Sequence, residues 1–63
     1  MRLSLKAIRI DRGFTQSEMA EALEVSRKTI ASWENGESMP TVDKVDDICA
    51  FLGVSYENIR WKV

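Results

Sequence analysis

Two short amphipathic segments meet at the three-residue turn 24–26, and this junction leaves few folds open to the chain. The stretch 16–35 reads QSEMAEALEVSRKTIASWEN, with apolar residues at helical spacing on both sides of the turn. Two helices that cross so closely need a small residue on the inner face of the first, and Ala20 stands there. The apolar residues expected to fix the crossing are Met19, Leu23, Val25, Ile30 and Trp33. The sequence therefore predicts a helix-turn-helix unit over 16–35.

The chain is short for a stably folded domain, and its composition offers few means of reinforcing the core. A protein of about 60 residues buries only roughly 60% of the surface that its unfolded chain exposes. The single cysteine, Cys49, allows no disulfide within the chain, and there is no histidine for a His/Cys metal site. Stability must come from compact helix packing, from association between chains, or from both. We expect one domain over residues 1–63, with Cys49 as a small apolar filler.

Start and stop signals divide the chain into five helical segments. The residues suited to the N-cap positions of these segments are Ser4, Thr15, Ser26, Thr41 and Ser55. Thr15 is followed three residues later by Glu18, which is the capping-box pattern. Glycine follows the first, third and fourth segments, at Gly13, Gly36 and Gly53. The fourth segment carries an apolar stripe formed by Val42, Val45, Ile48, Cys49 and Leu52.

The fold class that these segments predict is all-α, a compact domain of five helices. At the two ends of the chain, apolar and polar residues alternate, around Leu3 and Leu5 and around Ile59, Trp61 and Val63. This alternation leaves two alternatives open: short terminal β-strands that pair with each other, or a frayed tail.

Charge is unevenly distributed along the chain, although nine basic and ten acidic residues give a net charge of −1. Residues 1–17 carry a net +3, residues 18–47 a net −5 and residues 48–63 a net +1. A nucleic-acid-binding protein usually has a basic surface, but a local basic patch still binds phosphates. The charge therefore predicts modest non-specific affinity for DNA.

Several classes of protein are excluded by what the sequence lacks. No apolar run approaches the ~20 residues of a membrane-spanning helix, and residues 1–6 lack the apolar segment of a secretion signal. There is no nucleophile–base pair, glycine-rich phosphate loop or ligand set for a metal. We therefore expect a cytoplasmic protein that is not an enzyme and that binds no membrane, metal, cofactor or small-molecule ligand.

The most diagnostic residues run in a fixed order from the first segment to the end of the fourth. They are Gly13-Phe14-Thr15-Gln16, Met19-Ala20, Val25-Ser26, Ile30, Trp33-Glu34-Asn35-Gly36, Pro40 and Leu52-Gly53-Val54. With these residues the chain resembles the Cro/C1-type (Xre-like) helix-turn-helix family of bacterial and phage repressors, from Ser4 to Ile59. The resemblance implies a lambda-repressor-like domain that binds double-stranded DNA.

The second helix of the unit, 27–34, is the expected recognition helix. Because successive positions advance by ~100°, one side of it faces the core, with Thr29, Ile30 and Trp33. The opposite side is presented to the major groove and consists of Arg27, Lys28, Ala31 and Ser32. Arg27 and Lys28 can donate to guanine O6 and N7, whereas on an isolated helix they would be ordinary solvated charges. Ser32 can bond a base edge, and the methyl group of Ala31 can touch that of thymine.

Phosphate contacts are expected near the ends of the two helices. In the resembling family, a glutamine that opens the first helix of the unit and an asparagine that ends the recognition helix contact the DNA backbone. These positions correspond to Gln16 and Asn35. Asn35 also suits a helix end before glycine, and both roles are compatible. Weaker candidates for neutral phosphate contacts are Ser17, Ser38 and Thr41.

The resemblance also implies a partly buried ion pair between Arg9 of the first helix and Glu34 of the recognition helix. Neutralisation within the protein explains why an acidic residue is tolerated close to DNA. Arg9 is a phosphate candidate as well, because its guanidinium group can also be directed towards the DNA backbone.

Three residues depart from the commoner pattern of the family. Glu24 occupies a turn position where glycine is frequent, a left-handed site that costs a non-glycine residue on the order of 1 kcal/mol. Glu37 and Met39 stand in the loop after the recognition helix, where basic residues often touch phosphates. These departures weaken the expected binding to the DNA backbone, so specificity rests more on Arg27, Lys28 and the geometry of the dimer.

A single short recognition helix offers little contact, and related proteins bind palindromic sites as two-fold dimers. The candidate residues for a dimer surface are Phe51, Tyr56, Ile59, Trp61 and Val63. The alternative is that they pack within the chain against Leu3 and Leu5.

The function that we expect is a sequence-specific transcriptional regulator, a repressor that binds a palindromic operator as a homodimer. One alternative is an antitoxin-type autoregulator that also binds a partner protein. The other is a protein-interaction module that has lost DNA binding, an alternative that the net charge of −1 leaves open. Salt-dependent DNA binding separates this module from the two regulators.

Overall fold

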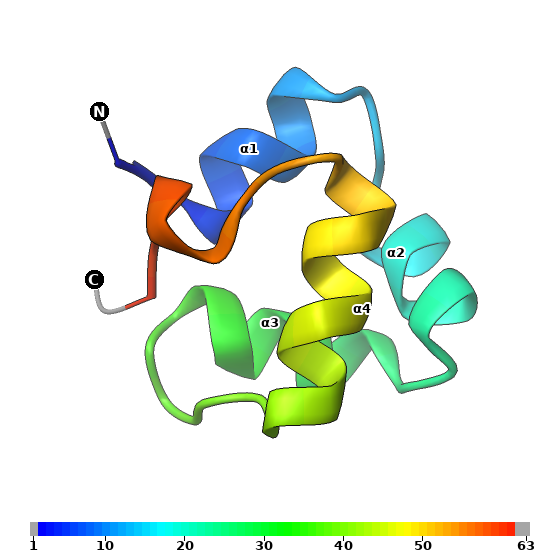
Figure 1. Ribbon diagram of the computed structural model, residues 1–63. Helices are drawn as coiled ribbons and strands as arrows, with labels where there is room; N and C mark the ends of the chain where they lie inside the picture. The colour runs from blue at the N-terminus through cyan, green and yellow to red at the C-terminus, as the bar shows by residue number, and fades with distance from the viewer. Residues whose placement is uncertain (1, 62–63) are drawn as a thin grey trace.

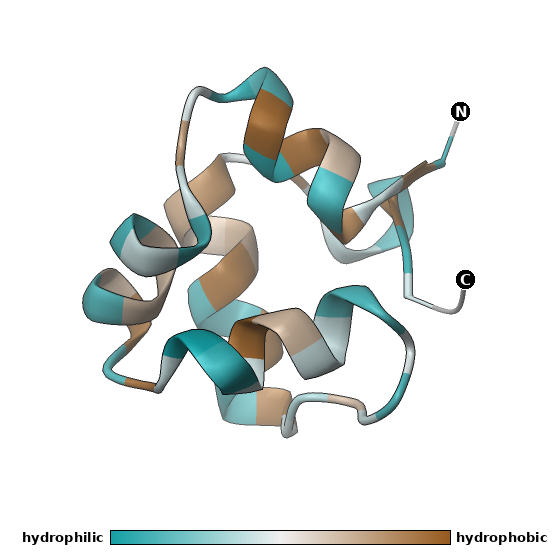
Figure 2. Ribbon diagram, turned by 180° about the vertical axis from the view of Figure 1, so that it is seen from behind, coloured by the Kyte–Doolittle hydropathy of each residue, from teal (hydrophilic) through white to brown (hydrophobic). Residues whose placement is uncertain are grey.

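A computed structural model describes residues 2–61 of the chain. In this range, four α-helices and one 3-10 turn are accompanied by two short strands (Figure 1). In chain order the elements are β1 (Leu3–Ser4), α1 (Leu5–Asp11), α2 (Gln16–Leu23), α3 (Arg27–Glu34), α4 (Val42–Leu52), η1 (Tyr56–Asn58) and β2 (Ile59–Arg60). Helices α1, α2 and α3 surround α4 in both ribbon views (Figures 1 and 2). No helix within the described range is long and apolar enough to cross a bilayer.

The caps of the four α-helices follow the sequence signals. In each, the predicted N-cap side chain accepts a hydrogen bond from the backbone N–H three residues on, at 3.0–3.4 Å. At Thr15 the capping box is complete, because its own N–H donates to Glu18 Oε1 at 2.8 Å. Glu24 ends α2 in the predicted left-handed conformation, with φ 58° and ψ 42°. Local signals therefore set the start and end of each helix.

The expected fifth helix is a single turn of 3-10 helix, so the prediction of five helices was wrong for residues 56–58. In this turn the Ser55 carbonyl accepts from the Asn58 N–H at 3.0 Å, and Asn58 Oδ1 accepts from the Ser55 N–H at 3.1 Å. The chain is already extended at Ile59, where it enters β2. No length is left for an α-helical turn to propagate.

The two ends of the described chain lie side by side (Figure 1). Strands β1 and β2 pair in parallel, with Leu3 opposite Ile59 and Ser4 opposite Arg60. Of the two alternatives for the chain ends, the paired strands are therefore the one that forms. Val63 lies outside the described residues.

The core is formed by one side of each α-helix and by Ile59 of β2. Met19, Ile30 and Ile48 are completely buried, Ala20 is 4% exposed, and α2 and α3 pack against each other. The apolar turns of α4 lie among the other helices (Figure 2). The prediction for Val42 was wrong, because this residue is 77% exposed. It is the first residue of α4 and precedes the part of the helix that enters the core.

One contact between distant elements ties α4 to the turn of the helix-turn-helix unit. Lys44 Nζ donates to the Leu23 carbonyl at 2.7 Å, in a partly buried position. This carbonyl belongs to the last turn of α2, where backbone acceptors lack helical partners and the helix dipole is negative. The ammonium group thus stabilises the end of α2 just before the left-handed Glu24.

Replacing Lys44 with methionine is expected to lower the free energy of unfolding by about 1.5 kcal/mol, because it removes a charged donor and keeps the apolar stem. Urea denaturation followed by circular dichroism measures the change. Lys28→Met is the matched control, since Lys28 is exposed and its replacement is expected to alter stability by less than about 0.5 kcal/mol. Equal losses in the two variants would contradict a role for the Lys44–Leu23 contact.

Candidate nucleic-acid interface

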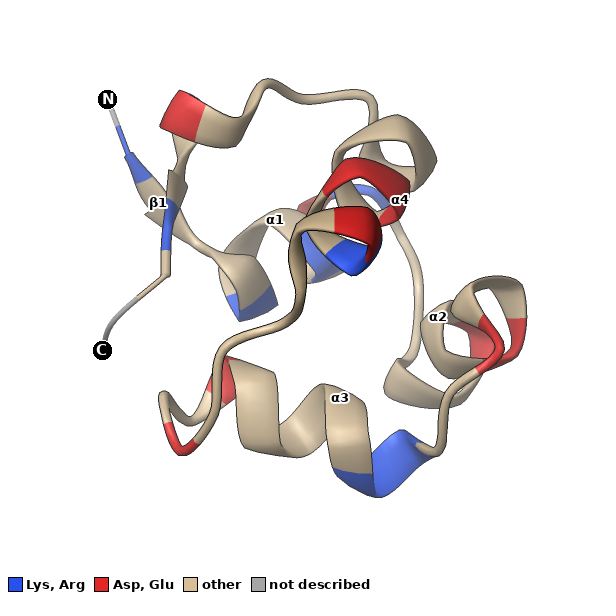
Figure 3. Cartoon of the chain, turned by 60° about the horizontal axis from the view of Figure 1, so that its bottom comes forward, with Lys and Arg blue, Asp and Glu red and all other residues tan. Residues whose placement is uncertain are grey.

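Helix α3 buries one side and exposes the other. Ser26 caps its start, and Ile30 and Trp33 anchor it in the core, with exposed fractions of 0% and 7%. Arg27 and Lys28 are exposed in its first turn, which forms a basic edge of the molecule (Figure 3). Within residues 2–61 neither side chain is engaged in an ion pair. We call the set Arg27, Lys28, Ala31 and Ser32 the outer face of α3.

The side chains of the outer face are less exposed towards the C-terminal end of α3. Ala31 and Ser32 are half-buried, and Ser32 Oγ lies 2.8 Å from Ser38 Oγ in the loop after α3. Each hydroxyl has one donor and two acceptor sites, so the pair retains one O–H group and further lone pairs for another partner. The structure thus brings together one predicted base-reading residue and one predicted phosphate-binding residue.

A buried ion pair joins α1 to the end of α3. Arg9 Nε donates to Glu34 Oε2 at 2.6 Å, and Arg9 Nη2 donates to Glu34 Oε1 at 3.3 Å. Arg9 Nη1 also donates to the Phe14 carbonyl at 2.7 Å, and Gln16 Nε2 donates to Glu34 Oε1 at 3.0 Å. Arg9 and Glu34 are 6% and 5% exposed. The carboxylate charge is therefore neutralised inside the protein, and one network fixes α1, α2 and α3 to each other.

A cleft of about 430 Å³ opens beside this network, at the start of α2. It brings together four residues predicted from the sequence: Arg9, Gln16, Ser17 and Arg27. Lys6 also lines the cleft, although it was not among the site residues predicted from the sequence. Its position three residues before Arg9 on the same helix was the available signal, because residues at i and i+3 share a helix face. The cleft combines two exposed cations with the positive end of the α2 dipole.

The other predicted phosphate residues lie at the opposite end of α3 and do not line the cleft. Asn35 is exposed and forms the C-cap of α3, just before Gly36 with φ 74°. Thr41 is exposed, and its hydroxyl accepts from the Lys44 N–H as the N-cap of α4. The loop between them carries the exposed Glu37, which makes this end acidic (Figure 3).

Comparison with known proteins places this arrangement in a family. A helix-turn-helix family model of the Cro/C1 type matches residues 5–59, which is most of the chain. The chain belongs to this family. The match covers all four α-helices, the turn between α2 and α3, and the basic edge of α3.

Individual relatives differ in how far they extend beyond this domain. The chain is 37% identical over 59 residues to an uncharacterized HTH-type transcriptional regulator of Methanocaldococcus jannaschii, covering 94% of this chain and 89% of the relative. It is 33% identical over 55 residues to the HTH-type transcriptional activator BcrR of Enterococcus faecalis, and 34% identical over 56 residues to the antitoxin PezA of Streptococcus pneumoniae. These matches cover 87% and 89% of this chain but only 27% and 35% of the two relatives.

The residues predicted for a dimer surface divide into two groups in this helix-turn-helix domain. Ile59 is 1% exposed, so its inclusion is corrected: its side chain is taken up by the core of its own chain. Phe51 is half-buried, with its ring centroid 4.4 Å from that of Phe14. Tyr56 is 56% exposed and stacks on the half-buried Trp61 at 5.7 Å. Among the described candidates, Tyr56 is therefore the exposed one, Phe51 and Trp61 keep part of their surface accessible, and Val63 lies outside the described residues.

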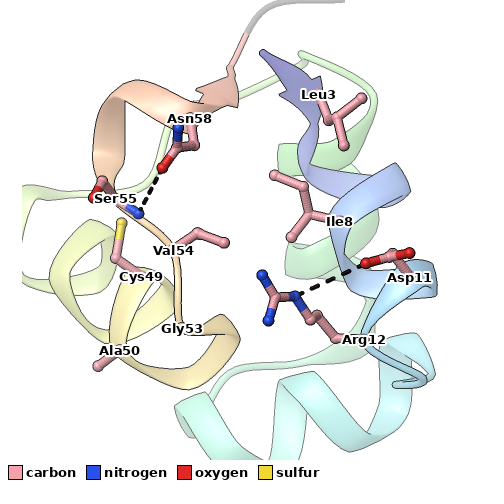
Figure 4. Close-up of a pocket in the computed structure, with 10 residues that line it drawn as sticks. All are labelled: Leu3, Ile8, Asp11, Arg12, Cys49, Ala50, Gly53, Val54, Ser55 and Asn58. Atoms are coloured by element: carbon pink, nitrogen blue, oxygen red, sulfur yellow. Dashed lines mark hydrogen bonds and ion pairs between the residues drawn. The ribbon is translucent and has the colours of Figure 1, made fainter. Parts of the chain in front are cut away.

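A pocket of about 640 Å³ lies between α1 and the end of α4, away from the outer face of α3 (Figure 4). Cys49 and Arg12 both line it, and Arg12 Nε is 4.0 Å from Asp11 Oδ2. Burial, and secondarily the negative charge of Asp46, raise the pKa of the Cys49 thiol above its ordinary value. The thiol is therefore protonated at neutral pH and a weak nucleophile, in keeping with the expected role as an apolar filler.

Iodoacetamide is expected to alkylate Cys49 at pH 7.5 more slowly in the folded protein than in urea, because only the thiolate reacts and the fold raises the thiol pKa. Mass spectrometry of quenched samples gives both rates. In the folded protein the rate should also rise at higher pH than in the unfolded protein, since the folded pKa is the higher one. Identical rates and identical pH profiles in the two states would show that the fold does not control this thiol.

Proposed function

We propose that this helix-turn-helix protein is a transcriptional regulator that binds double-stranded DNA by placing the first turn of α3 in the major groove. The observation that carries the proposal is the exposure of Arg27 and Lys28 on the side of α3 opposite its core anchors. Both side chains are long donors, and arginine bonds guanine O6 and N7 as a fork. Membership of the Cro/C1-type family supports the same reading.

In this proposal the cleft at the start of α2 receives a backbone phosphate. Lys6 supplies positive charge, and Ser17 supplies a hydroxyl. Gln16 Nε2 has two N–H groups, so its bond to Glu34 leaves one for the phosphate. Arg9 is almost completely buried. Its role is therefore to neutralise the carboxylate of Glu34, so that this charge does not repel the phosphate. At the other end of α3, Asn35, Ser38 and Thr41 supply neutral contacts.

The finer parts of the proposal concern the mode of regulation. We propose a cytoplasmic repressor that binds a palindromic operator as a homodimer, because one short helix reads few base pairs and two copies double the contact. Occupancy of the operator is sufficient for repression when it overlaps the site that the polymerase needs. The activity requires no catalytic step and no cofactor.

A second candidate function is an autoregulating antitoxin that binds a partner protein as well as DNA. The observation that favours it is the 34% identity to the antitoxin PezA. Co-purification of a small partner protein from the native organism distinguishes this function from a stand-alone regulator. The third alternative, an interaction module without DNA binding, is separated from both by the following titration.

Fluorescence anisotropy of a labelled random-sequence duplex, titrated between 20 and 200 mM salt, tests the proposed function. The three exposed cations at the interface, Lys6, Arg27 and Lys28, predict that log K falls with log salt at a slope of about −3 for each bound domain. Absence of binding at 20 mM salt, or binding that does not depend on salt, would refute the DNA-binding proposal and leave the interaction module.

A further inference from the structure

Exposed apolar side chains are concentrated in one place on the described surface. The large apolar residues that are substantially exposed are Leu3, Ile10, Met39, Val42 and Tyr56. Met39, Val42 and Tyr56, which are 51%, 77% and 56% exposed, line a single groove of about 410 Å³. The start of α4, the loop before it and η1 form this groove, and Asp46 stands at its edge. Such concentration on a small domain is typical of an interaction surface.

A second groove adjoins the first at Tyr56. It has a volume of about 290 Å³, and Arg2, Arg60 and Trp61 line it together with the same tyrosine. Arg2, Arg60 and Glu57 are exposed in its lining, so this groove has a net positive charge, whereas the first has the negative charge of Asp46. Tyr56 therefore forms a ridge between an apolar groove that Asp46 lines and a groove that two arginines and Glu57 line. We call the two grooves and this ridge the Tyr56 surface.

We propose that the Tyr56 surface is the homodimer interface, with Tyr56 close to the two-fold axis. The inference rests on the proposed function, which requires two copies on one operator. An interface of this symmetry uses the same patch on both copies, so the patch must complement itself in shape and in charge. The Tyr56 surface has both properties: a ridge beside a groove, and a negative charge in one groove beside a net positive charge in the other. In the dimer, Asp46 of each copy faces Arg60 of the partner subunit.

The position of the Tyr56 surface is compatible with DNA binding. None of its lining residues belongs to the outer face of α3 or to the cleft at the start of α2. The described domain measures 28 × 23 × 19 Å, so a dimer of two copies is long enough to span the roughly 34 Å of one DNA turn. The grooves are small, which predicts a dissociation constant for the dimer on the order of micromolar.

Analytical ultracentrifugation of the full chain tests the interface. Val42→Asp is expected to raise the dimer dissociation constant at least tenfold, because it places a charge in the apolar groove. Ile10→Asp is the matched control: Ile10 is 57% exposed but lies outside both grooves, and its replacement should change the constant less than twofold. Circular dichroism shows whether each variant is folded, and the high exposure of both residues predicts that they are.

Charge reversal gives a second and independent test. Asp46→Arg alone and Arg60→Asp alone should each weaken self-association, since each places like charges opposite one another. An equimolar mixture of the two variants should form heterodimers more readily than either variant forms homodimers. Unaltered self-association of Val42→Asp, no preference in the mixture, or a wild-type chain that stays monomeric at millimolar concentration would overturn the inference. If such a monomer still binds duplex DNA with the expected salt dependence, the proposed DNA binding stands and only the interface fails.

Discussion

Replacing Arg9 with methionine is expected to lower the free energy of unfolding by about 3–5 kcal/mol, which is the usual cost of removing one partner from a buried ion pair. The carboxylate of Glu34, whose side chain is 1% exposed, would then remain buried without its guanidinium. A domain of this size has a total stability of about 3–9 kcal/mol at the usual value per residue. The variant should therefore be partly or fully unfolded at 25 °C, as measured by urea denaturation followed by circular dichroism.

Two further substitutions show whether the pair itself is responsible. Glu34→Ala should be destabilised to a similar degree, because it leaves Arg9 buried and unpaired. The double variant Arg9→Met/Glu34→Leu should be more stable than either single variant, since no unpaired charge remains. Arg12→Met serves as the control: the Arg12 side chain is 45% exposed and 4.0 Å from Asp11, so a change below about 0.5 kcal/mol is expected. Unchanged stability of Glu34→Ala would rule out a structural role for the ion pair.

Replacing Arg27 with alanine is expected to weaken binding to the preferred operator about 5- to 150-fold for each half-site. This range corresponds to the roughly 1–3 kcal/mol that a bidentate base contact contributes to discrimination. Lys28→Ala should have a smaller effect, because lysine donates as a point charge and not as a planar fork. Anisotropy titrations with the operator and with a random duplex, at one salt concentration, give both affinities.

The ratio of the two affinities separates base reading from phosphate binding. Arg27→Ala should lower the affinity for the operator far more than the affinity for the random duplex. Arg12→Ala removes the same charge from a residue that lines the pocket of Cys49 and not the DNA interface, and should leave the ratio unchanged. An equal loss on both DNAs in the Arg27 variant would show that Arg27 binds phosphates and does not read bases.

Local interactions explain why much of the fold could be predicted from the sequence. A cap such as Thr15 with Glu18 involves residues three positions apart, and its geometry depends little on the rest of the chain. The left-handed turn at Glu24 is local as well. The core positions of α2 and α3 follow from helical periodicity, which placed Met19 and Ile30 correctly at 0% exposure.

The features that the sequence did not reveal depend on contacts between distant segments. Periodicity placed Val42 on the apolar stripe of α4 but could not show that the first turn of this helix lies outside the core. The hydrogen bond from Lys44 to the Leu23 carbonyl joins residues 21 positions apart, and no local sequence pattern predicts it. Lys6 joins the cleft only because α1 packs beside the start of α2.

At the C-terminal end, alternation of apolar residues did not distinguish a dimer surface from intrachain packing. Next to the pairing of β1 with β2, Ile59 is buried in the core of its own chain, whereas Tyr56 is exposed. The same pairing limits η1 to one turn, which is why the fifth helix does not form. A contact between the two ends of the chain is thus associated with the burial of Ile59 and with the absence of the predicted fifth helix.

Selection of bound sequences from a random duplex pool tests the central claim most directly. The wild-type chain should enrich a motif with two inverted half-sites whose centres lie about one helical turn apart, and guanines in that motif should lose enrichment in the Arg27→Ala variant. Failure of the wild-type chain to enrich any motif at low salt would contradict sequence-specific recognition by the outer face of α3.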